Sequence, residues 1–82
     1  MGDKTSRNLV LGLLAKEWEY SGPPGILDVS EIVAALPLAP SEALAALKEL
    51  FVAGLVDMNE IKTSAFLTPE GHEAAETAGK DI

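Results

Sequence analysis

Apolar residues recur every three or four positions in three stretches of the chain, the spacing that gathers them on one face of a helix. The pattern predicts helices over residues 5–20, 29–36 and 40–53, with Pro37 stopping the second and a left-handed Gly54 ending the third. The residues predicted to face the core are Leu9, Val10, Leu13, Leu14 and Trp18 of the first stretch, Val29, Ile32, Val33 and Leu36 of the second, and Ala43, Leu44, Leu47, Leu50 and Phe51 of the third.

Polar and turn-forming residues mark where these helices begin and end. Thr5 or Ser6 can cap the first helix, and the glycine- and proline-rich residues 21–25 break the chain after it. A very short extended segment follows. Asp28 then stands three positions before Glu31, which is the spacing of a capping box for the second helix.

The pattern changes after the third helix. Residues 55–59 and 65–67 are predicted as two strands joined by a loop over residues 60–64. Thr68, followed by a proline, is a typical start for a fourth helix, which should end near Gly79. The sequence therefore predicts a mainly α fold with a small antiparallel β-hairpin.

The composition fits one small globular domain over residues 1–82, with an ordered core at about residues 6–78. Hydrophobic residues make up 48% of the chain and charged residues 23%, which is unlike a disordered protein. The chain has no cysteine, which excludes disulfides and thiol catalysis. No apolar run approaches the roughly 18 residues of a membrane span. We expect a cytoplasmic protein that does not enter membranes.

Residues that could carry catalysis or bind metal do not form a recognisable set. His72 is the only histidine, whereas a zinc site needs three or four converging ligands. Glu70, Glu73 and Glu76 are spaced as on a solvated helix face, with no nucleophile near them in the sequence. We therefore expect no enzymatic activity, no catalytic residues, no metal and no cofactor.

Two motifs near the hairpin resemble those of MarR-like transcription regulators. Residues 47–56, Leu-Lys-Glu-Leu-Phe-Val-Ala-Gly-Leu-Val, are similar to the segment where the recognition helix of that family turns into its wing. Residues 67–71, Leu-Thr-Pro-Glu-Gly, resemble the motif that closes the wing. The similarity covers about residues 8–76. It implies a winged helix-turn-helix domain with a three-helix core, a wing and a short C-terminal helix.

The resemblance also implies a function and a set of site residues. In this family the third helix enters the DNA major groove and the wing contacts the neighbouring backbone. Full-length members add long terminal helices that form dimers, for which 82 residues leave no room. Carried over by position, the reading surface would consist of Ser41, Glu42, Ala45, Ala46, Lys48, Glu49, Val52, Lys62 and Thr63.

The charge distribution argues against strong DNA binding. The chain carries 13 acidic and 6 basic residues, for a net charge of -7. Residues 26–82 hold three lysines against ten acids, so all the excess negative charge lies in the part that would face DNA. The outward face of the third helix has no arginine, asparagine or glutamine to read bases. DNA binding through the third helix and the wing would be weak or would need a partner.

The same surface supports a second hypothesis, a protein–protein interaction or dimerisation module that does not bind DNA. Ala45, Ala46 and Val52 are small or apolar at positions predicted to face solvent, between glutamates. Met58 and Ile61 on the wing could extend such a contact surface. Alternatively, these alanines are simply good helix formers on an ordinary surface. Of the two hypotheses, we expect a regulator-type protein whose own DNA contacts are weak, and the interaction module is the alternative.

Overall fold

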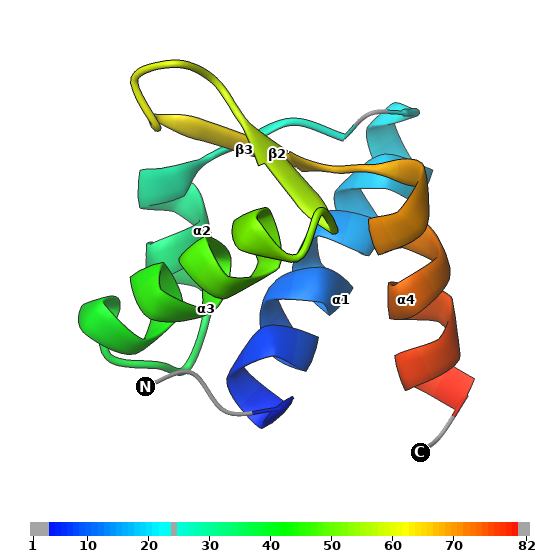
Figure 1. The fold of residues 1–82 in the computed structure, drawn as a ribbon, viewed down its shortest axis with the longest axis horizontal. Helices are drawn as coiled ribbons and strands as arrows, with labels where there is room; N and C mark the ends of the chain where they lie inside the picture. Colours follow the sequence, from blue (N-terminus) through cyan, green and yellow to red (C-terminus); the bar gives the residue numbers. More distant parts are fainter. Residues whose placement is uncertain (1–3, 24, 81–82) are drawn as a thin grey trace.

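This computed structural model describes residues 4–23 and 25–80, which form four α-helices and three short β-strands. Figure 1 shows how the helices are arranged beside the hairpin of the wing. Residues 1–3, 81–82 and Pro24, a member of the predicted turn, lie outside the described residues. The order confirms the predicted mainly α winged-helix fold, with β2 and β3 forming the wing. The elements are α1 (Lys4–Ser21), β1 (Leu27–Asp28), α2 (Val29–Ala35), α3 (Pro40–Val52), β2 (Val56–Met58), β3 (Ser64–Leu67) and α4 (Pro69–Lys80).

The sheet has one strand more than the predicted hairpin. Strand β1 pairs antiparallel with β3, Leu27 opposite Ala65, and the strand order is β1-β3-β2. The backbone N–H of Val29 continues this pairing, since it donates to the carbonyl oxygen of Thr63 at 2.8 Å. Two residues are too few to show the alternating pattern of a strand, so the sequence predicted only a short extended segment here. The wing is thereby attached to the start of α2.

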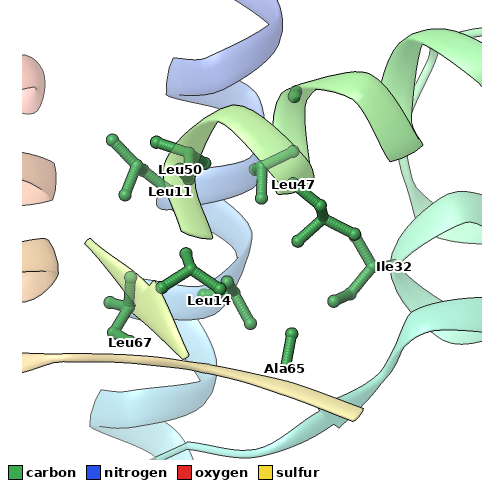
Figure 2. Close-up of a cluster of buried hydrophobic side chains, with 10 residues drawn as sticks. Leu11, Leu14, Ile32, Leu47, Leu50, Ala65 and Leu67 are labelled. Atoms are coloured by element: carbon green, nitrogen blue, oxygen red, sulfur yellow. The ribbon is translucent and has the colours of Figure 1, made fainter. Parts of the chain in front are cut away.

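The core lies where α1, α2 and α3 meet one face of the sheet. Figure 2 shows leucines of α1 and α3 converging with Ile32 of α2 and with Ala65 and Leu67 of β3. In α1 the buried residues include Leu11, whereas the predicted Leu9 and Leu13 are only half-buried. The reason is that α1 packs against both α3 and α4, so its buried face is wider than one stripe.

The two predicted N-terminal caps of α1 and α2 are not formed as expected. Helix α1 begins at Lys4, so Thr5 and Ser6 lie inside its first turn, and Ser6 is buried. Asp28 does occupy the N-cap position of α2, but its side chain makes no capping hydrogen bond. The wing carbonyl of Thr63 satisfies the first N–H of α2 instead.

The predicted boundaries of α3 and α4 are better reproduced. Helix α3 starts at Pro40, and the Glu42 carboxylate accepts the N–H of Ala39 at 3.3 Å. Gly54 follows its end with a φ of +80°, as predicted for a left-handed glycine. Helix α4 extends to Lys80, one residue beyond the predicted end near Gly79.

The Leu-Thr-Pro-Glu-Gly segment joins the end of α3 to the start of α4. The Thr68 hydroxyl donates to the carbonyl oxygen of Gly54 at 2.7 Å and accepts the N–H of Gly71 at 3.0 Å. The Thr68 N–H donates to the carbonyl of Leu55 at 3.2 Å. Gly71 is buried so closely against Leu55 that a Cβ would run into the Leu55 carbonyl. The threonine and the glycine of this motif therefore have structural roles.

Candidate interaction surface on α3 and the wing

The residues predicted for the reading surface do not all share one surface. The structure exposes most of them along the outer side of α3 and on the wing. Ala45 and Glu49 are half-buried, and Ala46 is fully buried. The exposed members are Ser41, Glu42, Lys48, Val52, Lys62 and Thr63.

The prediction for Ala46 is wrong, and so is the matching one for Leu44. Ala46 lies in the hydrophobic core, whereas Leu44, predicted to face inward, is 49% exposed. The buried residues of α3 follow an unbroken helical spacing through positions 43, 46, 47 and 50. Leucine is more apolar than alanine, so the hydropathy pattern placed Leu44 rather than Ala46 on the buried face of α3. The outer side of α3 is therefore more apolar than expected.

Glu49 is directed toward α1. Its carboxylate pairs with the Arg7 guanidinium at 2.8 Å, and both side chains are more than one-third exposed. A pair of this kind contributes only about 0–1 kcal/mol to stability. The pair matters for the surface because it holds the chain's single arginine, Arg7, beside Glu49 and away from the wing.

The wing is shaped by hydrogen bonds from one asparagine. The Asn59 side-chain oxygen accepts the N–H groups of Thr63 and Ser64 at 2.8 and 2.9 Å, and its amide donates to the Thr63 hydroxyl at 2.8 Å. Lys62 takes a left-handed φ of +60°, uncommon for a non-glycine residue. Its ammonium lies 4.2 Å from the centre of the Phe51 ring, a cation–π contact. The wing is thus held against α3.

An apolar groove runs between α3, the wing and α2. One hollow of about 370 Å³ lies between α3 and β2, and a second of about 490 Å³ lies between α2 and α3. They share Val29, Leu44 and Lys62, so we treat them together as the α3–wing groove. The first is lined by Val29, Leu44, Leu47, Lys48, Phe51, Val52, Met58 and Lys62, and the second by Val29, Ser30, Val33, Ala34, Leu44, Lys62 and Thr63.

Sequence reasoning missed several of these groove residues. Leu44 and Phe51 were assigned to the core because they continue the apolar stripe of α3, although Phe51 is half-buried beside Lys62. Met58 was noted on the wing and does line the groove, whereas Ile61, 75% exposed, does not. The sequence did contain a signal for them: α3 has more apolar residues than one buried face can hold, so some of these residues had to be exposed.

The residues singled out in the sequence as possible metal ligands or acid–base groups have other surroundings in the structure. In residues 4–23 and 25–80, no group of three or more histidine, aspartate or glutamate side chains is arranged to hold a metal ion. His72 instead stacks on Trp18, with ring centres 4.6 Å apart, and its Nδ1 lies 3.1 Å from the Glu76 carboxylate. None of the helices described is long and apolar enough to span a membrane.

Comparison with known proteins bears on the fold. The structure superposes on the crystal structure of NadR in complex with 4-hydroxyphenylacetate with a TM-score of 0.75 and 24% sequence identity. The match covers 93% of this chain and 52% of NadR, so the chain spans about half the length of that protein. No family model and no curated protein matches the sequence. The likeness supports the winged-helix fold.

Proposed function

We propose that this chain is a non-enzymatic winged-helix protein that binds another protein through the α3–wing groove and contacts DNA only weakly by itself. The observation that carries the proposal is the apolar character of the outer side of α3. Leu44 is 49% and Val52 77% exposed, and both line a hollow with Phe51 and Met58. Large apolar side chains grouped around a groove are typical of interaction surfaces.

The charges support a protein partner over DNA. Lys48 and Lys62 are the basic residues that line the groove, and the ammonium of Lys62 already lies over Phe51. Affinity for duplex DNA depends on neutralising phosphates. Each phosphate contact adds about 0.9 to the slope with which the logarithm of the binding constant falls with the logarithm of the salt concentration. Two lysines on a chain of net charge -7 therefore give a slope of roughly 2 and weak binding.

A second candidate function is that of a DNA-binding transcription regulator. It is favoured by the likeness to NadR, a MarR-family regulator, and by the positions of Lys48 on α3 and Lys62 on the wing. In this case a second protein or a second copy of the chain would supply further phosphate contacts.

The protein-binding proposal predicts that Val52→Asp abolishes capture of a specific partner from cells, because it places a charge in the apolar groove. Tyr20→Asp is the matched control, since Tyr20 is 91% exposed on α1 and lies outside the groove. Capture is followed by quantitative mass spectrometry, and binding is repeated with the purified partner. A partner that binds the wild type and Val52→Asp equally well would remove the groove from the interaction.

The DNA candidate is tested by an NMR titration with mixed-sequence duplex DNA at about 50 mM salt. We expect weak binding with a salt slope of roughly 2, lost in the Lys48→Glu/Lys62→Glu double variant. Saturable binding with a slope above about 4 would require more phosphate contacts than these lysines provide. That result would favour the regulator over the protein-binding module.

A further inference from the structure

The α3–wing groove has a chemistry that identifies the class of its partner. We propose that it binds an amphipathic α-helix whose apolar stripe is flanked by aspartate or glutamate. This inference rests on the proposed protein-binding function and specifies it further. It is carried by the length of the groove, by its apolar lining and by the sign of the charges beside that lining.

The length of the groove matches about two turns of a helix. Leu44 and Val52, eight residues apart on α3, both line it, and at about 1.5 Å per residue they lie roughly 12 Å apart along the helix axis. Apolar side chains at positions i, i+4 and i+7 of a partner helix cover roughly the same length. Phe51 of α3 and Met58 of β2 add a broad, adaptable apolar lining between these ends.

The charges beside the groove select an acidic helix. In the described part of the chain, every charged residue that lines the two hollows is a lysine, Lys48 or Lys62. This is unexpected for a protein with 13 acidic and 6 basic residues. Lys62 lines both hollows, and its ammonium lies over the Phe51 ring, so a carboxylate beside the apolar stripe of a bound helix would meet a positive charge there. Close contacts between these lysines and carboxylates are screened by salt less than the repulsion from acidic residues more than about 8 Å away.

Two other occupants agree less well with the structure. An extended peptide could add to the free edge of β2, but that strand is only three residues long, Val56–Met58. A second copy of the chain would bring a further net charge of -7 to the interface. The proposed experiment distinguishes both from the amphipathic helix.

The test is a selection on the full chain from a displayed library of randomised sequences in both helical and extended scaffolds. We expect enrichment of helices with apolar residues at i, i+4 and i+7 and with acidic residues beside them. A synthetic peptide of the enriched sequence should bind at least tenfold more weakly to Lys48→Glu/Lys62→Glu and lose measurable binding to Leu44→Asp. Lys16→Glu is the charge control, because Lys16 lies on α1 outside the groove. Selection on the double variant should enrich lysine and arginine instead.

The outcomes separate this inference from the function on which it rests. Enrichment of extended or basic peptides whose binding is lost in Leu44→Asp would overturn the acidic helix and leave protein binding at the groove intact. Peptides that bind Leu44→Asp as well as the wild type would contradict both. Failure to enrich any peptide, together with dimers that dissociate in Leu44→Asp, would replace the helix by a second copy. Circular dichroism of each variant establishes that it remains folded.

Discussion

Replacing Gly71 by alanine should destabilise the protein by about 2–3 kcal/mol, although alanine is the better helix former. Gly71 lies in the first turn of α4, where an added Cβ would overlap the Leu55 carbonyl oxygen and come within 2.8 Å of its carbon. Neither neighbour can yield easily. The clashing atoms belong to the Leu55 backbone, between α3 and β2. It is fixed by the Leu55 N–H, which donates to the Leu50 carbonyl, and by the Thr68 N–H, which donates to the Leu55 carbonyl.

Gly12 provides the matched control for this substitution. It also lies within a helix, α1, but a Cβ built there would meet nothing within 4 Å. Gly12→Ala should therefore stabilise the protein by up to about 1 kcal/mol through helix propensity alone. Urea unfolding followed by circular dichroism at 222 nm measures both changes. Equal effects of the same sign would show that the close approach at Gly71 is not present in solution.

Replacing Leu47 by alanine should cost about 3 kcal/mol, because it leaves a cavity in the core. Leu47 is 1% exposed and packs with Leu14, Ile32 and Leu50. A loss of this size is a large share of the stability of an 82-residue domain, so the unfolding midpoint should fall steeply.

Leu44→Ala is the control for Leu47→Ala, three positions away on the same helix. Leu44 is 49% exposed, so removing the same atoms there should cost less than about 1 kcal/mol. Together the two variants test directly which face of α3 is buried. If both variants lost the same stability, Leu44 would lie in the core, as its apolar character alone suggested, and would not line the groove.

The fold could be predicted from the sequence because its signals are local. Pro37 and Gly54 end helices through their own backbone restrictions, and Thr68 caps α4 because its hydroxyl accepts the N–H of Gly71, only three residues away. The pairing of strand β1 was not predicted, because its partner is β3 and Leu27 lies opposite Ala65, 38 residues later. Local patterns carry no information about such a pairing.

The candidate site could be predicted only in part, because its shape also depends on contacts between residues far apart in the sequence. Lys48, Val52 and Lys62 were placed on α3 and the wing by their positions in the motif, and they do line the groove. Whether a residue of α3 faces the groove or the core depends on how closely α1 approaches. That distance follows from packing rather than from hydropathy, so Ala46 was wrongly assigned. The Arg7–Glu49 pair joins residues 42 positions apart and has no sequence signature.

The attachment of the wing to α2 places one backbone amide where its hydrogen exchange reports on the contact between them. The first N–H of a helix ordinarily faces water and exchanges its hydrogen freely. In this chain that group, on Val29, is held by the Thr63 carbonyl of the wing. Hydrogen exchange at this one amide therefore reports the opening of the contact between the wing and α2.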